Sequence, residues 1–276
     1  MALPEIITDW FAERGWSPRR HQLEMLDQAD AGRHALLVAS TGAGKTLAGF
    51  LPTLRDFADG GAHDGLHTLY ISPLKALAHD VQRNLLTPVQ DMGLNVRIET
   101  RSGDTPSDRK ARQRARPPHI LLTTPESLSL LLSYPESAEM FGSLKTVIID
   151  EVHAFAASKR GDLLSLSLSR LQALAPEMRR VALSATVADA DSYRAWLAPH
   201  GDIDAVALVE GEPGADPDLS ILITDDRVPW AGHSAHYAVP QVLEEIERNQ
   251  TTLVFCNTRF LAEFIFQKLW ELNEKH

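Results

Sequence analysis

Short, uninterrupted apolar runs constrain the fold of this 276-residue chain more than any other feature of its sequence. Their length suits strands, and the longer segments between them have the pattern of helices. Because the runs are continuous rather than alternating, we expect parallel strands that helices cover on both faces. The predicted strands are 34–39, 68–72, 120–123, 146–149 and 180–184, and the predicted helices between them include 74–92, 126–133, 162–174 and 189–197. The sequence therefore predicts an α/β fold with a parallel sheet.

A break in composition divides the chain near residue 210. Segment Glu210–Asp218 holds two prolines, two glycines and four acids, which suit neither a helix nor a central strand. We therefore expect a first lobe over residues 1–210, a linker over 211–218 and an incomplete second lobe over 219–276. In the second lobe the pattern predicts strands at 219–224 and 252–256 and helices at 235–248 and 261–272.

Composition excludes several classes of protein. The 27 Lys and Arg residues against 37 Asp and Glu residues give a net charge of −10. This excludes a basic protein that binds nucleic acid through its net charge alone. No apolar run approaches the roughly 18 residues that span a membrane, and the N-terminus lacks the pattern of a secretory signal. The single cysteine, Cys256, cannot form an internal disulfide, which fits a reducing compartment. We expect a soluble cytoplasmic protein with no membrane partner.

The segment Ala39–Thr46, with sequence ASTGAGKT, lies between a predicted strand and a predicted helix. Gly42 and Gly44 allow backbone N–H groups to surround phosphate oxygens at a helix N-terminus. Lys45 can reach the β- and γ-phosphates, and the Thr46 hydroxyl can bind Mg²⁺. The usual pattern begins with Gly, where this chain has Ala39. The alternative is a glycine-containing turn that binds no ligand. The predicted nucleotide-binding residues of this loop are Thr41, Gly42, Ala43, Gly44, Lys45 and Thr46.

A second motif, Asp150-Glu-Val-His153, follows the predicted strand 146–149. Carboxylates at the carboxyl end of a parallel strand lie where ligands bind in open α/β sheets. Asp150 would hold Mg²⁺ through water, and Glu151 would orient or deprotonate the attacking water. The alternative is a helix N-cap with surface acids. We predict Lys45, Asp150 and Glu151 as catalytic residues and Thr46 and Asp150 as the Mg²⁺ site.

Together with Ser184-Ala-Thr186, these two motifs resemble those of the DExH group of superfamily 2 helicases. The resemblance implies a RecA-like lobe that uses ATP and Mg²⁺. It further implies that Ser184 and Thr186 couple hydrolysis to movement and that His153 links the two motifs. Phe11, Gly15-Trp16, Pro18 and Gln22 resemble the family's Q-motif. The Gln22 amide can donate to and accept from adenine, and Phe11 can stack on the base, which favours ATP over GTP. The alternative is an amphipathic N-terminal helix.

Three further segments resemble the family's motifs for binding one nucleic-acid strand, namely 72–77, Ser102-Gly103 and 123–128. The resemblance implies contacts from Pro73, Lys75, Ser102, Gly103, Thr124, Pro125 and Glu126. Each segment alone could be an ordinary capped start of a helix. Between Arg97 and Arg116 there are seven basic and three acidic residues, which could add salt-sensitive phosphate affinity or form a solvated helix face.

Segments 228–235 and 251–259 resemble the large helicase-related (Lhr) group, most closely its ligase-associated bacterial branch. That branch consists of DNA-dependent ATPases and 3′-to-5′ DNA helicases of repair that work beside an ATP-dependent ligase and a nuclease. The resemblance implies DNA as partner and contacts from Asn257 and Arg259. Motifs V and VI of the family are not found here. We therefore expect an N-terminal motor fragment that needs a missing C-terminal helicase portion and hydrolyses ATP weakly. An RNA helicase and a non-catalytic binding module remain alternatives.

Overall fold

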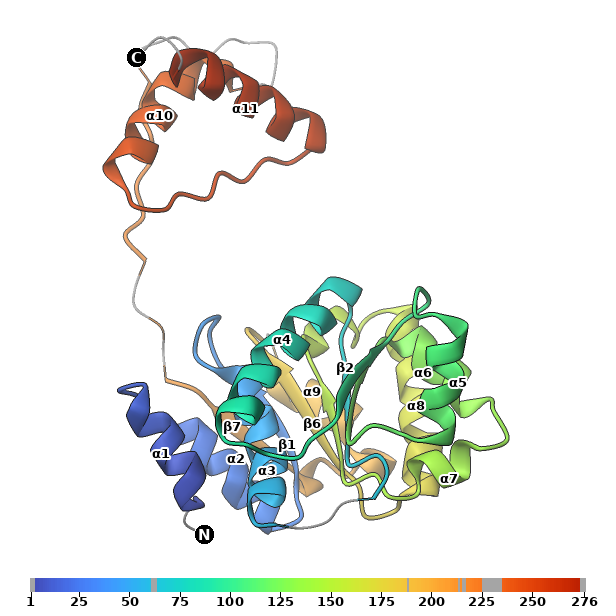
Figure 1. The fold of residues 1–276 in the computed structure, drawn as a ribbon. Coiled ribbons are helices and arrows are strands. Elements are labelled where there is room, and N and C mark those ends of the chain that lie inside the picture. The colour runs from blue at the N-terminus through green and yellow to red at the C-terminus, as the bar shows by residue number, and fades with distance from the viewer. Residues whose placement is uncertain are drawn as a thin grey trace. The chain divides into compact units, whose positions relative to one another are not determined.

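The computed structural model describes residues 3–60, 64–187, 189–212, 214, 217–224 and 235–273. The chain divides into two compact units, Met1–Gly214 and Ala215–His276 (Figure 1). Among the described helices, none combines the length and the apolar character that crossing a membrane requires.

The first unit contains a seven-stranded parallel sheet with the order β3-β4-β2-β5-β6-β1-β7. All the strands predicted for the first lobe are confirmed to within one residue at each end. The strands are β1 (His34–Val38), β2 (Thr68–Ile71), β3 (Ile98–Arg101), β4 (Ile120–Thr123), β5 (Thr146–Ile149), β6 (Arg179–Ser184) and β7 (Val206–Glu210).

The sequence pattern missed β3 and β7, which are the two edge strands of the sheet. The β3 sequence is IETR and that of β7 is VALVE, so polar residues interrupt both. An edge strand has a neighbour on one side only and tolerates polar side chains that a central strand excludes. The apolar runs therefore predicted the five central strands of the sheet but not its two edge strands.

Helices cover both faces of the sheet (Figure 1). One core contains Phe50, Ile148 and Leu183, and the other contains Leu36, Ile149 and Leu168. On the first face lie α1 (Glu5–Glu13), α2 (Arg20–Asp30), α3 (Lys45–Ala58) and α4 (Lys75–Asp91). On the second face lie α6 (Pro125–Leu132), α7 (Ser137–Phe141), α8 (Lys159–Leu174) and α9 (Ala190–Leu197). The remaining helical segments are α5 (Ser107–Ala115) and the short 3₁₀ turns η1 (Val152–Ala154), η2 (Pro199–Gly201) and η3 (Ile203–Ala205).

In its described residues the second unit contains a 3₁₀ turn, η4 (His236–Ala238), followed by α10 (Val239–Arg248) and α11 (Arg259–Asn273), and the two helices pack on each other. Both helices were predicted, with starts that differ by a few residues. The predicted strands at 219–224 and 252–256 are wrong, because neither segment forms a strand in the structure. A parallel strand takes its hydrogen bonds from a neighbour, and no strand lies among the described residues of this unit. Of the predicted segment 228–235, all but Ala235 lies outside the described residues.

Candidate nucleotide and nucleic-acid site

The carboxyl ends of the parallel strands lie along one edge of the sheet, and many of the predicted site residues stand at or directly after these ends. Among three neighbouring strands, β5 is followed by Asp150, β6 ends at Ser184 and is followed by Ala185 and Thr186, and β1 is followed by the loop 39–46. The neighbouring strands β2, β4 and β3 are followed by the segments that contain Pro73, Thr124 and Ser102. One half of the edge thus carries the predicted nucleotide residues, and the other half carries the predicted nucleic-acid residues.

The loop 39–46 has the backbone conformation that its glycines allow. Gly42 has a φ of 79° and Gly44 a φ of 77°, a left-handed region that disfavours other residues. A Cβ at Gly44 would lie 2.9 Å from the Nε2 of Gln22, so a larger residue here would displace the end of the Gln22 side chain. The Lys45 ammonium donates to the Ser40 carbonyl at 3.1 Å. The loop leads directly into α3, whose N-terminus favours an anion.

A cavity of about 420 Å³ adjoins the loop. Gln22 lines it, and its Oε1 accepts from the backbone N–H of Arg19 at 2.9 Å. Phe11 forms part of the wall but is only 3% exposed, whereas Trp16 is 59% exposed. Stacking on a base requires an accessible ring face, and Trp16 therefore suits that role better than Phe11. The full lining is Phe11, Trp16, Ser17, Arg19, Gln22, Gly42, Gly44 and Leu47.

Thr46 lines a neighbouring cavity of about 370 Å³ together with Trp10, Trp16 and Asn84. The two cavities share Trp16 and Leu47. The predicted nucleotide residues from Phe11 to Thr46 are therefore gathered around one loop and its two adjoining cavities. Three further lining residues, Trp16, Ser17 and Arg19, were not predicted as contacts, although all three lie in or next to the segment that resembles the Q-motif.

Asp150 stands at the end of β5 and is 7% exposed. Its Oδ1 accepts from the backbone N–H of Glu151 at 2.9 Å, and its Oδ2 accepts from the hydroxyl of Tyr70 in β2. Glu151 has a φ of 48°, in the left-handed region that non-glycine residues rarely adopt. Strained backbone of this kind occurs often at functional sites.

The residues predicted to couple the two motifs are in contact. His153 Nδ1 lies 2.9 Å from Ser184 Oγ and 3.4 Å from Glu151 Oε2. The Ser184 hydroxyl donates its proton to the Thr186 carbonyl at 2.8 Å. Because that hydroxyl has only one proton, His153 Nδ1 must carry a hydrogen and donate it to Ser184. A chain of hydrogen bonds therefore links the ends of β5 and β6.

Tyr70 is a site residue that sequence reasoning missed. Burial, followed by the charge of Asp150, raises the pKa of the Tyr70 phenol above its ordinary value. The group therefore stays protonated and acts as a donor to Asp150 at neutral pH. In the sheet, Tyr70 pairs with Ile148, so the strand register could have indicated that its side chain lies on the same face as Asp150.

Arg160, near the start of α8, is a second residue that sequence reasoning missed. Its guanidinium binds the Glu126 carboxylate, with Nε 2.6 Å from Oε1 and Nη2 3.2 Å from Oε2. It also donates from Nη1 to the Pro73 carbonyl at 3.0 Å. Burial raises the pKa of Glu126, but Arg160 and other donors lower it overall below its ordinary value. Arg160 thus joins two of the predicted nucleic-acid segments.

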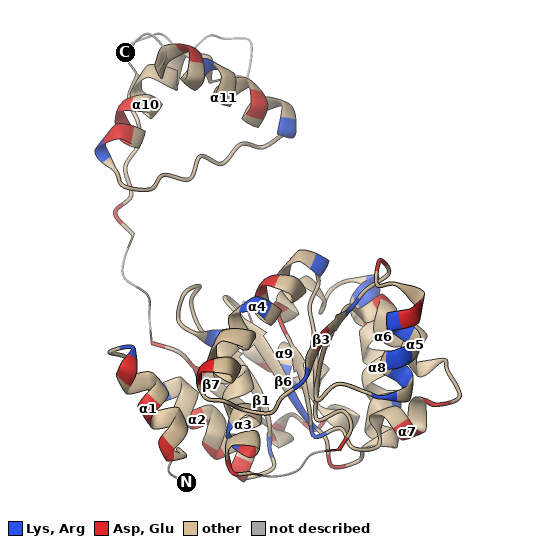
Figure 2. Cartoon of the chain, viewed as in Figure 1, with Lys and Arg blue, Asp and Glu red and all other residues tan. Residues whose placement is uncertain are grey.

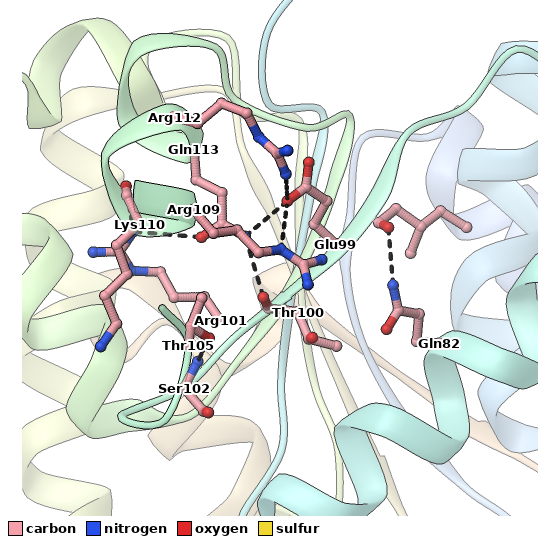
Figure 3. A network of polar contacts seen from close by, with 11 residues as sticks. Gln82, Glu99, Thr100, Arg101, Ser102, Thr105, Arg109, Lys110, Arg112 and Gln113 are labelled. Carbon is pink, nitrogen blue, oxygen red and sulfur yellow. Dashed lines mark hydrogen bonds and ion pairs between the residues drawn. The ribbon is translucent and has the colours of Figure 1, made fainter. Parts of the chain in front are cut away.

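Figure 3 shows a polar network between β3 and α5 that holds the turn containing Ser102 and Gly103. The buried Arg101 donates to the Lys110 carbonyl at 2.9 Å. The backbone N–H of Ser102 donates to Thr105 Oγ1 at 2.9 Å, and the Lys110 ammonium donates to the Gly103 carbonyl at 2.7 Å. The turn is therefore fixed by side chains from the segment that follows it.

Basic residues gather along α5 (Figure 2), yet several of them are engaged within the chain. Glu99 accepts from Arg109, Arg112 and Gln113 at 3.2, 2.8 and 2.9 Å. Burial raises the pKa of Glu99, and these three donors lower it overall. Glu99 is already one of the three acids counted between residues 97 and 116, so the net charge of the segment is unchanged, but two of its basic side chains, Arg109 and Arg112, are engaged within the chain.

Lys75, another predicted nucleic-acid residue, pairs with Asp104 at 2.7 Å, and both side chains are exposed. Thr124 caps α6, where its Oγ1 accepts from the Ser127 N–H at 3.5 Å. Asn257 and Arg259 lie in the second unit, where both are exposed and Arg259 begins α11. The structure thus gathers Pro73, Lys75, Ser102 and Thr124 on one sheet edge, and it does not relate Asn257 and Arg259 to that edge.

Residues 19–193 match the family model of the DEAD/DEAH box helicases. The chain is 38% identical to the Lhr helicase/uracil glycosylase of Escherichia coli K12, over 98% of this chain and 20% of that protein. It is 35% identical to the ATP-dependent helicase Lhr-Core of Methanothermobacter thermautotrophicus, over 95% of this chain and 32% of that protein. The chain therefore spans between a fifth and a third of the length of these curated relatives.

Among solved structures, the chain is similar to Mycobacterium smegmatis helicase Lhr bound to ssDNA and AMP-PNP. The TM-score is 0.83 at 34% sequence identity, and the match covers 99% of this chain and 36% of that one. The first unit thus has the RecA-like arrangement that the sequence resemblance implied.

Proposed function

Because this chain belongs to the DEAD/DEAH box helicase family and is similar to Lhr helicases, we propose that it binds ATP with Mg²⁺ and one strand of DNA as part of a helicase motor. The observation that carries the proposal is the shared edge of the sheet. Three adjacent strands, β1, β5 and β6, end at the loop 39–46, at Asp150 and at Ser184, and Ser184 is hydrogen-bonded to His153. The next three strands, β2, β4 and β3, end at the segments predicted to bind nucleic acid.

The surroundings of Asp150 support a cation at this position. Its carboxylate is buried, its hydrogen bonds come from the Tyr70 hydroxyl and the Glu151 N–H, and it forms no ion pair with a basic side chain among the described residues. A buried carboxylate without a basic partner favours a bound cation. Mg²⁺ is usually held by one or two carboxylates together with phosphates and waters. This agrees with the absence, in the described part of the chain, of any cluster of three potential metal ligands.

In the proposed reaction, each residue has a distinct part. The N–H groups of residues 41–46 and the Lys45 ammonium hold the phosphates, and Thr46 and Asp150 hold Mg²⁺. Gln22 and the ring of Trp16 bind the adenine, and Phe11 forms part of the wall behind them. When bound, Mg²⁺ neutralises charge on the β- and γ-phosphates. Glu151 orients the attacking water and accepts its proton.

The contact between His153 and Ser184 supports coupling between the nucleotide and the strand. His153 contacts both residues through one ring nitrogen, since its Nδ1 lies 2.9 Å from Ser184 Oγ and 3.4 Å from Glu151 Oε2. A displacement of Glu151 during hydrolysis would therefore reach β6 through these two contacts. We propose that His153, Ser184 and Thr186 transmit such a change.

For the DNA strand we propose backbone contacts from one edge of the first unit. Hydroxyl, ammonium and N–H groups at helix starts suit phosphates. Glu126 is bound by Arg160, so its part is to position the segment rather than to touch a phosphate. Relatives support DNA, since the Mycobacterium smegmatis helicase was solved with ssDNA. The proposed contacts are Pro73, Lys75, Ser102, Gly103, Thr124 and Pro125, with Asn257 and Arg259 from the second unit.

We extend the proposal to the organisation and biological role of the protein. Residues 1–210 form the first RecA-like lobe, 211–218 the linker, and 219–276 the beginning of the second lobe. On the sequence resemblance alone, the motor moves 3′-to-5′ in DNA repair beside an ATP-dependent ligase and a nuclease.

The test is titration calorimetry of the chain with AMP-PNP and Mg²⁺. The Lys45→Ala variant should lose about tenfold or more in nucleotide affinity, because a charge-assisted contact with phosphate is removed. The matched control is Lys145→Ala, because Lys145 is exposed and lies immediately before β5. This variant should bind AMP-PNP with the affinity of the wild type. Equal affinity of Lys45→Ala and wild type would overturn the proposed nucleotide site.

The same chain, loaded with AMP-PNP, is then titrated with single-stranded DNA and RNA of one sequence, followed by fluorescence anisotropy. Tighter binding of DNA is expected, with affinity falling as salt rises because phosphates are contacted. Tighter binding of RNA would overturn the choice of DNA and leave the nucleotide site unaffected.

A further inference from the structure

The hydroxyl of Tyr70 donates a hydrogen bond to Asp150, the carboxylate proposed to hold Mg²⁺. We propose that Tyr70 is a positioning residue, which fixes the Asp150 carboxylate in the orientation that Mg²⁺ binding requires. This inference rests on the proposed function, and it adds a residue from β2 to a site built from the loop 39–46 and the end of β5.

The sheet register explains how Tyr70 reaches Asp150. Tyr70 in β2 pairs with Ile148 in β5, and Asp150 follows Ile148 by two residues. Alternate residues of a strand share one face, so Tyr70 and Asp150 lie on the same side of the sheet. The phenol is long enough to extend from its own position to the edge where Asp150 stands.

Packing leaves the Tyr70 ring little freedom. The side chain is fully buried, and its ring stacks on that of Phe50 in α3, with centroids 5.4 Å apart and planes 27° apart. Helix α3 begins at Lys45, directly after the phosphate-binding part of the loop. The donor is therefore held between the sheet and the helix that carries the nucleotide loop.

Two donors fix the plane of the Asp150 carboxylate. One oxygen accepts from Tyr70 and the other from the Glu151 N–H. A carboxylate oxygen can accept more than one hydrogen bond, so both oxygens retain capacity for Mg²⁺-bound water. Groups that orient a metal-binding carboxylate in this way commonly control metal affinity.

A different explanation is that Asp150 merely satisfies a buried tyrosine hydroxyl, since such hydroxyls usually find a partner. The two explanations predict different results when the hydroxyl alone is removed. If Tyr70 only fills the core, its loss changes stability and leaves the Mg²⁺ dependence of nucleotide binding unchanged. If Tyr70 positions Asp150, its loss changes that dependence.

The experiment uses Tyr70→Phe in the full chain, because phenylalanine keeps the ring and its packing on Phe50. AMP-PNP affinity is measured by calorimetry across a series of Mg²⁺ concentrations and in EDTA. The Mg²⁺ concentration for half-maximal affinity should rise about tenfold or more, while affinity in EDTA stays within about twofold of wild type. The matched control is Tyr193→Phe, on α9 at the opposite face of the sheet, which should leave the Mg²⁺ dependence unchanged.

If the Mg²⁺ dependence of nucleotide binding is the same in Tyr70→Phe and in the wild type, the inference is wrong. The proposed function still stands in that case, provided that the wild type binds AMP-PNP in a Mg²⁺-dependent way. An equal loss of affinity with Mg²⁺ and in EDTA would also overturn it, because it would indicate a general structural role. If the wild type itself shows no Mg²⁺-dependent nucleotide binding, the proposed function fails and this inference fails with it.

Discussion

The two units of this chain contain apolar runs of the same kind, and only those of the first unit form strands. Runs 146–149 and 252–256 read TVII and TLVFC, which are similar in length and in apolar character, although all four residues of the first and only two of the second are β-branched. The first is fully enclosed in the centre of the sheet as β5, between β2 and β6. The second has no strand pairing, and its Phe255 is 89% exposed.

The difference shows what an apolar run can and cannot specify. Each central strand of the first unit pairs with a strand on both sides, and helices bury both faces. In the second unit, Ile221 is 91% exposed, and no other strand lies among the described residues to accept its hydrogen bonds. A run becomes a strand only where neighbours supply both its hydrogen bonds and its apolar cover.

The largest expected difference between the units is in amide hydrogen exchange. Amides of β1, β5 and β6 should exchange about a thousandfold or more slowly than unprotected amides, because they open only with the whole unit. Amides of 217–224 and 252–256 should exchange at close to the unprotected rate, since no ladder holds them. Mass spectrometry of peptic fragments measures both in one sample. Strong protection of 252–256 would contradict the comparison and would mean that this segment finds a strand partner in solution.

A matched pair of phenylalanines gives the next largest effect. Phe50 is completely buried between α3 and the sheet, whereas Phe255 is almost completely exposed. Phe50→Ala should lower the free energy of unfolding by about 3–5 kcal/mol, because it leaves a cavity in a packed core. Phe255→Ala should change it by about 0.5 kcal/mol or less. Urea denaturation followed by circular dichroism compares the two, and equal effects would show that Phe255 is buried in solution.

The same contrast explains which parts of the site could be predicted from sequence. The loop 39–46, Asp150 and Ser184 were predictable because each stands at or directly after the end of a central strand, and the carboxyl ends of parallel strands lie at one edge of the sheet. The contacts of Tyr70 and Arg160 were not, because each joins separate elements through side chains. They depend on the register of β2 against β5 and on where α8 begins beside Pro73 and Glu126.

The availability of the basic residues was also beyond sequence reasoning. Their number between residues 97 and 116 is visible in the sequence, but their partners are not. Glu99 lies in a strand that the pattern missed, and α5 folds back over that strand so that Arg109 and Arg112 meet it. A count of charges, Glu99 included, therefore gives the net charge of the segment but does not show which of its basic side chains are already paired within the fold.

The smallest expected effect concerns pH and the burial that distinguishes the first unit. Burial, followed by the charges of Arg180 and Arg179, lowers the pKa of His34 in β1 from its ordinary value of 6.5 to about 4. Its Nδ1 accepts from the Arg180 N–H at 2.9 Å, which requires the unprotonated nitrogen. Between pH 6.5 and 4 the unfolded chain therefore binds a proton that the folded chain does not. The free energy of unfolding must therefore fall as the pH decreases through this window. Above about pH 7 the imidazole is unprotonated in both states, so His34 causes no further change in stability with pH.

His34→Asn isolates this effect, because the asparagine oxygen can still accept from Arg180 but does not titrate. Between pH 7 and 5, the wild type should lose about 1 kcal/mol more unfolding free energy than the variant, after allowance for partial solvent screening. Urea denaturation at the two pH values measures the difference, and the interval stays above the range where the acidic groups with lowered pKa, such as Glu99, begin to protonate. Parallel pH profiles for the two proteins would show that His34 titrates normally in the folded chain. The amino end of β1 would then be more open to water than the packing of the first unit implies.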